Sequence, residues 1–332
     1  MLPMESVVSR GSENKTLDLF KALACIWVTQ THLPTVFSTV LGEFYYCQWF
    51  FRFCVPFFFA CSGYFFYRAK DQKKTLKRIA WLFALSNVLY LPAILSGAGN
   101  LSEVLSKLRW NLVFGYEHLW YLSATLEGLI FWYVLERIPV LSGLFRKFAI
   151  PVSIFLLLTG SLLDEYYHLF DSGFVAWAGG FLSSFGGPRN VVFLGFPMLI
   201  LGGAVARYER AFRKIPGWLL PMLWVLFRAL AFFECTWLLD RLGCEISLDL
   251  SFFGWIPALI LLELSFRFQV PIPTGFARLL RRMAEYVYIL HPLVAMLIGA
   301  YLQVSPMVLW IATIVLCSTL YLLLEKNFVL KK

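Results

Sequence analysis

The chain has 332 residues, of which 60% are apolar, 18% are aromatic and only 15% are charged, and its mean hydropathy is +0.71. Soluble domains usually carry about 25% charged and under about 50% apolar residues, so a soluble enzyme, a disordered chain and a secreted disulfide scaffold are excluded. The net charge of +9 does not indicate nucleic-acid binding, because the basic residues form short runs between apolar stretches rather than a stripe. The sequence predicts a polytopic membrane protein.

About ten apolar segments approach the roughly 20 residues that a helix needs to cross the hydrocarbon layer. In chain order they are expected near 17–37, 46–67, 79–95, 118–136, 148–163, 189–206, 216–233, 250–266, 284–302 and 306–325. The longest intervals between them are 96–117, 164–188 and 234–249. We therefore expect an all-α transmembrane bundle formed by a single domain over 1–332, with 1–16 as a cytoplasmic tail.

The distribution of basic residues predicts the orientation of this bundle. An even number of spans places both termini on one side of the membrane, and most of the 29 Lys and Arg residues fall in segments on that side. The outer loops hold Lys107, Arg109 and Arg241. Because cytoplasmic segments carry the excess of Lys and Arg, we expect cytoplasmic termini in a multi-pass protein of the cell membrane.

The seven cysteines show no spacing with histidine that resembles a zinc site, and we expect neither a metal nor a bound cofactor. Most of them lie in apolar spans, where a small buried thiol is ordinary. Cys235 and Cys244 flank an outer segment, where a disulfide persists if that compartment is oxidising. The sequence leaves this pairing open.

Ionisable side chains inside a span are costly, which makes each one a candidate for function. In the first span Lys21 and His32 are eleven residues apart, about three helical turns, and are expected on one face about 16 Å apart. Asp18 lies one turn before Lys21. Taken singly, Lys21 is an ordinary cytoplasmic anchor and His32 an ordinary interior histidine. Together they indicate a polar path from the cytoplasmic end into the bundle.

Other polar and small residues mark the later spans. The ionisable residues in or beside them include Arg52, His118, Glu127, Arg189 and His291. Pairing of opposite charges that only holds helices together is one explanation, and positioning of a substrate is the other. The small residues Ser62 and Gly63 predict close approach of another helix. Lys77 and Arg78, ahead of the third span, are explained by topology or by binding of an anionic, phosphate-bearing donor.

In chain order these residues resemble the motifs of the membrane-bound acyltransferase family 3. The matching elements are Leu17-Asp18 with Lys21 and His32, Val55-Pro56 through Ser62-Gly63-Tyr64, Lys77-Arg78, His118-Leu-Trp120-Tyr121-Leu, and Tyr288-Ile-Leu-His291-Pro292. The fourth element is most similar to the branch that includes the membrane half of vancomycin-resistance serine racemases. One residue departs from the family pattern. Lys21 stands where Arg is usual, which keeps the charge but loses the planar, bidentate fork.

The resemblance implies transfer of an acyl group, most often acetyl, from cytoplasmic acyl-CoA to a hydroxyl of a cell-surface glycan or a lipid-linked precursor. It implies His32 as general base or transient acyl carrier, with Asp18 as the second catalytic residue. Acyl-CoA, a donor substrate rather than a cofactor, would be held by Lys21, Lys77 and Arg78. The implied substrate-positioning residues are Arg52, His118, Glu127, Arg189 and His291. Membrane lipids, and a second copy in a homodimer, complete the expected partners, with no nucleic acid among them.

Two other classes of function stay open at this point. The same ionisable residues would suit a transporter or flippase of a small polar substrate, although no clear inverted repeat is visible. A non-catalytic membrane scaffold is the third class. Consumption of acyl-CoA distinguishes an acyltransferase from a transporter and from a scaffold.

Overall fold

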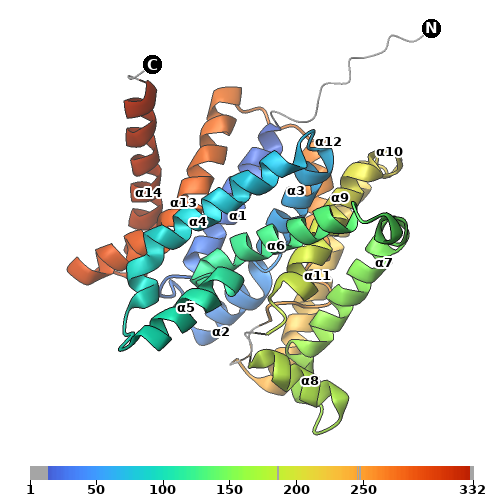
Figure 1. The fold of residues 1–332 in the computed structure, drawn as a ribbon, viewed down its shortest axis with the longest axis horizontal. Helices are drawn as coiled ribbons and strands as arrows, with labels where there is room; N and C mark the ends of the chain where they lie inside the picture. The colour runs from blue at the N-terminus through green and yellow to red at the C-terminus, as the bar shows by residue number, and fades with distance from the viewer. Residues whose placement is uncertain (1–13, 185–186, 245, 247, 330–332) are drawn as a thin grey trace.

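The computed structural model describes residues 14–184, 187–244, 246 and 248–329, and over these ranges the protein is helical without strands (Figure 1). Most of the expected tail, 1–16, lies outside the described residues. The main helices follow the expected spans in order: α1 (Lys15–Gln30), α3 (Cys54–Arg68), α4 (Gln72–Leu95), α6 (Trp120–Leu135), α7 (Pro139–Leu163), α9 (Phe196–Arg207), α11 (Leu219–Leu242), α12 (Ile256–Arg267), α13 (Thr274–Tyr301) and α14 (Pro306–Val329).

Six helical segments of the described chain are long and apolar enough to cross a membrane. They are Val40–Arg68, Gln72–Leu95, Pro139–Leu163, Leu219–Leu242, Thr274–Tyr301 and Pro306–Leu324. The helices α1, α6, α9 and α12 have 16, 16, 12 and 12 residues. The structure therefore supports an all-α, multi-pass membrane protein, whereas the count of about ten spans stays a prediction.

The two edges of the bundle differ in the elements they carry. The short helices α2 (Val40–Tyr45), α5 (Leu101–Phe114) and α8 (Phe174–Ser183) lie along the lower edge in Figure 1. The start of α1 and the end of α14 lie at the upper edge. There Arg68 pairs with Glu209 of α10 (Glu209–Phe212) at 2.5 Å, and Arg281 pairs with Asp18 at 3.6 Å. We call the upper edge, with the first turns of α1, α4 and α13, the basic edge.

The first helix ends earlier than the expected span of 17–37. Thr31 follows the last helical residue, and its hydroxyl donates back to the carbonyl of Val28 at 2.7 Å. Pro34, three residues further, has no backbone N–H with which to continue the helix. His32 therefore lies in the turn beyond α1, and the expectation that it shares a helical face with Lys21 is wrong.

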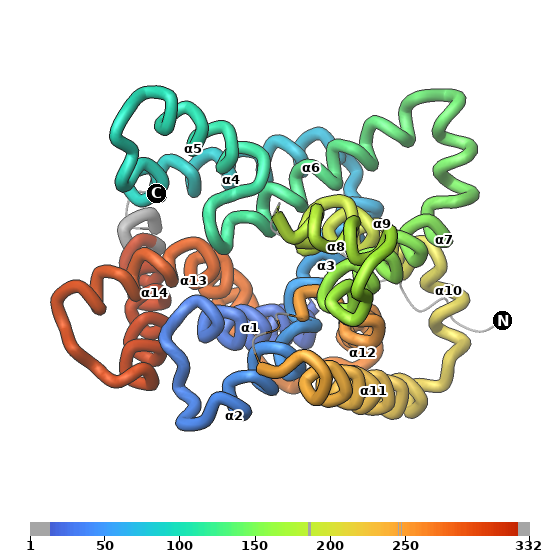
Figure 2. Tube along the Cα trace, turned by 90° about the horizontal axis from the view of Figure 1, so that it is seen from below, coloured from blue at the N-terminus to red at the C-terminus, as the bar shows by residue number. Residues whose placement is uncertain are grey.

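Helices α3 and α9 form the centre of the bundle, with α1, α13 and α14 stacked to one side (Figure 2). A side chain on Gly63 of α3 would overlap the carbonyl of Leu199 on α9, and one on Gly202 of α9 would overlap the carbonyl of Ala60. The two backbones are thus in direct contact, as is usual where small residues face each other in membrane bundles. The close approach predicted at Gly63 is confirmed.

This contact predicts a loss of stability when Gly63 is replaced by alanine. The added methyl group meets backbone rather than a flexible side chain, and overpacking of this kind typically costs about 1–3 kcal/mol. We expect a lower apparent Tm in detergent and less protein in the membrane fraction. Gly143→Ala is the matched control, because nothing lies within 4 Å of a methyl group there. Equal Tm values for the two variants would contradict the close contact.

Candidate functional site

His32 lies where two cavities meet. The larger cavity, of about 350 Å³, is lined by His32 together with Gln48, Arg52, Glu117, Trp120, Arg189 and Asp249. The smaller, of about 40 Å³, is lined by His32, His118, His291, Tyr121, Tyr288 and Cys25. The polar residues of the large cavity lie in the connections where α3, α6 and α9 begin and α11 ends. They therefore lie at the edge opposite the basic edge.

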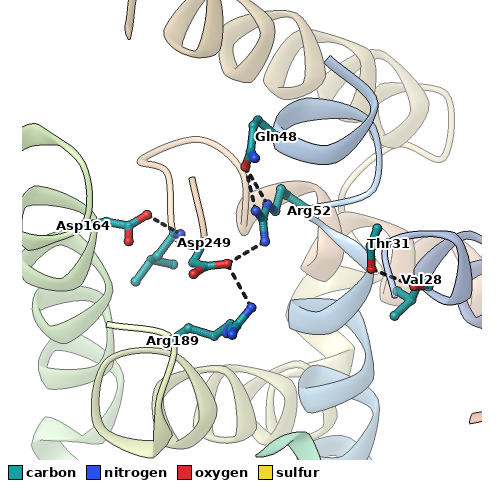
Figure 3. A network of polar contacts seen from close by, with 8 residues as sticks. Val28, Thr31, Gln48, Arg52, Asp164, Arg189 and Asp249 are labelled. Carbon is teal, nitrogen blue, oxygen red and sulfur yellow. Dashed lines mark hydrogen bonds and ion pairs between the residues drawn. The ribbon is translucent and has the colours of Figure 1, made fainter. Parts of the chain in front are cut away.

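Two arginines share one carboxylate in the wall of the large cavity (Figure 3). Arg52 Nη1 lies 2.6 Å from Asp249 Oδ1, and Arg189 Nη1 lies 3.4 Å from the same oxygen. Gln48 Oε1 accepts a further hydrogen bond from Arg52 at 2.6 Å. The Arg189 side chain is 43% exposed and lies over the Trp120 ring at 5.3 Å. A cation held on an aromatic face and a shared carboxylate form a wall of fixed hydrogen-bonding groups.

A buried arginine holds the turn that carries Gln48 and Arg52. Arg228, on α11, donates from Nη2 to the carbonyls of Trp49 and Phe50 at 2.6 and 3.1 Å. These carbonyls end the π-helical turn η1 (Tyr46–Phe50), which interrupts the span ahead of α3. Since unpaired carbonyls are costly at membrane depth, Arg228 has a structural role, and it fixes the side of the cavity formed by this turn.

Two buried carboxylates hold the loop that carries Asp249. Asp164, at the end of α7, accepts the backbone N–H of Leu250 at 2.9 Å. Glu234 of α11 accepts the backbone N–H of Phe252 at 2.7 Å. Both bonds satisfy amide groups of an irregular segment that packs inside the protein. The shared carboxylate of the large cavity is therefore fixed by groups on two different helices.

Asp164 gives the fold a measurable dependence on pH. Burial and the nearby carboxylate of Asp249 raise the pKa of Asp164 well above its usual range. The folded state then binds this proton more tightly than the unfolded chain, so the contribution to stability falls as pH rises from about 4, where an ordinary Asp titrates. We expect the wild-type Tm to fall more steeply over this range than that of Asp164→Asn, which does not titrate. Parallel Tm–pH curves would contradict the assignment.

The small cavity brings three histidines together. The ring centroids of His118 and His291 are 5.0 Å apart, those of His32 and His291 5.3 Å, and those of His32 and His118 6.1 Å. His118 and His291 are 2% and 1% exposed, whereas His32 is open to the large cavity. Within the described ranges no three His, Cys, Asp or Glu side chains are arranged to hold a metal ion. The cluster is thus a set of buried imidazoles with one accessible member.

The segment that carries His118 is held in a strained conformation. Glu117, directly before it, has a φ of 44°, and it is the one non-glycine residue with positive φ in the described chain. Such a conformation costs about 1–3 kcal/mol and persists where surrounding contacts fix it. Here the Tyr288 hydroxyl donates to the carbonyl of His118 at 2.7 Å. This contact ties the entry of α6 to α13.

At the basic edge, the first turns of α13 connect the expected donor-binding residues. Asp18 pairs with Arg281, and one turn further along α13 Glu285 pairs with Arg78 at 3.4 Å. The Nζ atom of Lys21 lies 4.9 Å from the centre of the Phe65 ring. Arg281 is not among the residues singled out from the sequence, and its ion pair with Asp18 places it beside the expected donor-binding residues.

The other predicted residues are placed as follows. The structure brings Arg52 and Arg189 together with His32 around the large cavity, and His118 and His291 together with His32 around the small one. Glu127 lines neither cavity and accepts a hydrogen bond from Ser123 at 3.1 Å. Asp18 lies at the opposite end of α1 from His32.

The cysteine pair left open by the sequence is not bonded. Cys235 is a buried free thiol on α11, and Cys244 is an exposed free thiol beyond the end of that helix. Eight residues, most of them helical, lie between the two and separate them by more than about 10 Å, whereas a disulfide requires Cα atoms within about 7 Å.

Comparison with known proteins agrees with this architecture. The profile of the acyltransferase 3 family, described as an acyltransferase domain, matches residues 14–324. An amino-acid racemase of Enterococcus faecalis is 26% identical over 223 residues, which are 62% of this chain and 30% of the racemase. The match therefore covers less than a third of that relative. No solved structure matches the chain.

Proposed function

The chain belongs to the acyltransferase 3 family, and we propose that it transfers an acyl group, acetyl above all, from cytoplasmic acyl-CoA to a hydroxyl of a cell-surface glycan or a lipid-linked precursor. The observation that carries the proposal is the place of His32, at the junction of a polar cavity and a cluster of buried imidazoles. A nucleophilic hydroxyl can enter the polar cavity, and the imidazole cluster can hold the proton that this hydroxyl loses.

The donor enters at the basic edge, which we place in the cytoplasm of a protein of the cell membrane. Lys21, Lys77 and Arg78 hold the phosphates of CoA, and Arg281 completes the group through Asp18. Nine residues of α1 separate Lys21 from the end of the helix, about 14 Å along its axis. The extended arm of CoA follows this helix and presents its thioester near His32. Asp18 acts on the donor site rather than on the reacting atoms.

The acceptor enters the large cavity from the opposite edge. Its walls combine planar polar side chains with an indole ring, as Arg52, Asp249 and Trp120 show. Such groups hydrogen-bond neighbouring hydroxyls and stack on the apolar face of a sugar ring. Arg52 and Arg189 orient the acceptor, and His118 and His291 support His32 from the other side.

The reaction follows from these positions. A nitrogen of His32 takes the proton of the acceptor hydroxyl while the oxygen of that hydroxyl attacks the carbonyl carbon of the thioester. The C–S bond breaks, and CoA leaves as a thiolate that takes the proton from the imidazolium. The products are an O-acyl ester and free CoA. Because the donor and the acceptor are both bound next to His32, their reaction becomes effectively unimolecular, which lowers its barrier.

Transfer of a labelled acyl group tests this function against transport. Purified protein in nanodiscs is incubated with acetyl-CoA carrying a heavy acetyl group and with a panel of glycan acceptors, and masses of acceptor and CoA are followed. We expect the heavy acetyl group on an acceptor and an equal amount of free CoA. Uptake of a polar substrate by proteoliposomes, without any consumption of acyl-CoA, would support the transporter instead.

A further inference from the structure

Pro292 changes the hydrogen bonding of α13 next to His291. A proline inside a helix has no N–H, so the carbonyl four residues earlier, that of Tyr288, loses its helical partner. His291 Nδ1 lies 3.0 Å from this oxygen and 2.9 Å from the carbonyl oxygen of Val287. Carbonyl oxygens only accept, so Nδ1 carries the proton. The other ring nitrogen, Nε2, therefore has the lone pair.

The neighbouring turn of α13 is held as firmly. The hydroxyl of Tyr90, on α4, donates to the carbonyl of Ile289 at 2.7 Å and accepts from the N–H of Leu293 at 3.3 Å. Tyr90 thus inserts into the helical ladder immediately beside Pro292. The ring of His291 is fixed by its own backbone and by a second helix, and it has little freedom to exchange its two nitrogens.

The free nitrogen of His291 faces the small cavity. Nε2 is buried, and no hydrogen-bond partner for it exists in the described part of the chain. Three other polar groups around this cavity have partners elsewhere: Tyr288 donates to the carbonyl of His118, Cys25 donates to the carbonyl of Ala284, and the hydroxyl of Tyr121 lies 3.1 Å from that of Ser62. Two imidazoles lie beside this nitrogen, that of His32 and that of His118, whose own ring nitrogens are both buried without a partner in the described part of the chain.

The ring centroids of His118 and His32 lie 5.0 and 5.3 Å from that of His291, so both are near enough, and of the two it is His32 that also lines the large cavity. An N–H···N hydrogen bond of about 3 Å between two imidazoles corresponds to centroids about 5 Å apart. We propose that His291 is a positioning residue: a small movement of the exposed His32 ring lets Nε2 of His291 accept the N–H of His32, so that the second nitrogen of His32 presents its lone pair to the large cavity. In the proposed function, on which this role in catalysis rests, the same bond stabilises the imidazolium until the CoA thiolate takes its proton.

The reactivity of His32 toward diethylpyrocarbonate tests the proposal without any substrate. The chain has four histidines, of which His118 and His291 are buried. His168 is exposed in η3 (Tyr166–Leu169), so it serves as an internal reference. The purified protein in detergent is treated with the reagent, and mass spectrometry of its peptides gives the rates at His32 and His168. The neutral nitrogen attacks the reagent, so the ratio of the two rates reports the nucleophilicity of His32.

We expect His291→Leu to lower the ratio about tenfold, the size of one hydrogen bond, and His291→Gln to recover part of it, because a side-chain amide oxygen can accept the same N–H. Cys25→Ala, in the wall of the same cavity, is the matched control and should change the ratio less than twofold. A ratio unchanged in His291→Leu, or lowered equally in Cys25→Ala, would overturn the proposal. If the ratios of the modification rates are as expected but the wild type transfers no acyl group, the proposed function is overturned, whereas the interaction between His32 and His291 is supported.

Discussion

Replacing His32 with alanine is expected to lower acyl transfer by about 10²- to 10⁴-fold, the usual contribution of a positioned base. His32 lines both cavities, and no other imidazole of the cluster is open to the large one, since His118 and His291 are 2% and 1% exposed. The measurement is acceptor-dependent release of CoA by purified protein, with the amount of folded protein checked by size exclusion. His168→Ala removes an exposed histidine that lines neither cavity, and this variant serves as the control. Full activity of His32→Ala would remove this residue from the mechanism.

The second large effect is expected at Asp249. Its carboxylate holds two guanidinium groups, at 2.6 and 3.4 Å, and Asp249→Asn removes the charge that they share while nearly preserving the shape of the side chain. Removing one partner of a buried pair commonly costs about 3–5 kcal/mol, and because Arg189 is half-exposed we expect only part of this, a rise in the KM for the acceptor of about 10- to 100-fold.

The KM for acyl-CoA should not change, because the expected donor residues lie at the basic edge. Asp240→Asn, an exposed carboxylate on α11, is the matched control. A rise in the KM for acyl-CoA equal to that for the acceptor would contradict the division of the site into two edges. An unchanged KM for both substrates would contradict the place of the acceptor in the large cavity.

Much of the fold can be predicted from the sequence because the lipid environment restricts which backbone structures can cross a membrane. Each backbone amide at membrane depth has to be paired within a helix, so apolar segments of the right length predict helices in the right order. The apolar pattern predicts the end of the first span at residue 37, seven residues too late, because the pattern continues through Pro34 whereas α1 ends at Gln30. The extension of α11 to Leu242 was also missed, because charged residues near a helix end weaken the apolar signal.

The residues of the candidate site, too, could be predicted only in part from the sequence. His32, Arg52, His118, Arg189 and His291 could be singled out because ionisable groups are rare in apolar segments, and the structure gathers them around two adjoining cavities. Asp249 could not be found, since its partner Arg52 is 197 residues away and one acidic residue in a polar connection carries no local signal. Glu127 has the same signal as the others and lines neither cavity.

The residue pattern Tyr288-Ile-Leu-His291-Pro292 shows why contacts are needed to explain a motif. In the sequence its members carry a family resemblance and interrupt an apolar segment, but nothing there says what each residue does. In the structure the tyrosine holds the backbone of His118, and the proline leaves a carbonyl that fixes the proton of His291. Each role depends on a partner from another helix or on a missing amide, and neither can be read from hydropathy.

The most direct test of the account separates the two substrates by the membrane. Proteoliposomes with the basic edge inward are loaded with acetyl-CoA, and the glycan acceptor is supplied only outside. We expect free CoA inside and acetylated acceptor outside, in equal amounts, with neither formed by His32→Ala. Acetylated acceptor that appears only when both substrates are on the same side would contradict a reaction at His32 between a donor from the basic edge and an acceptor from the opposite one.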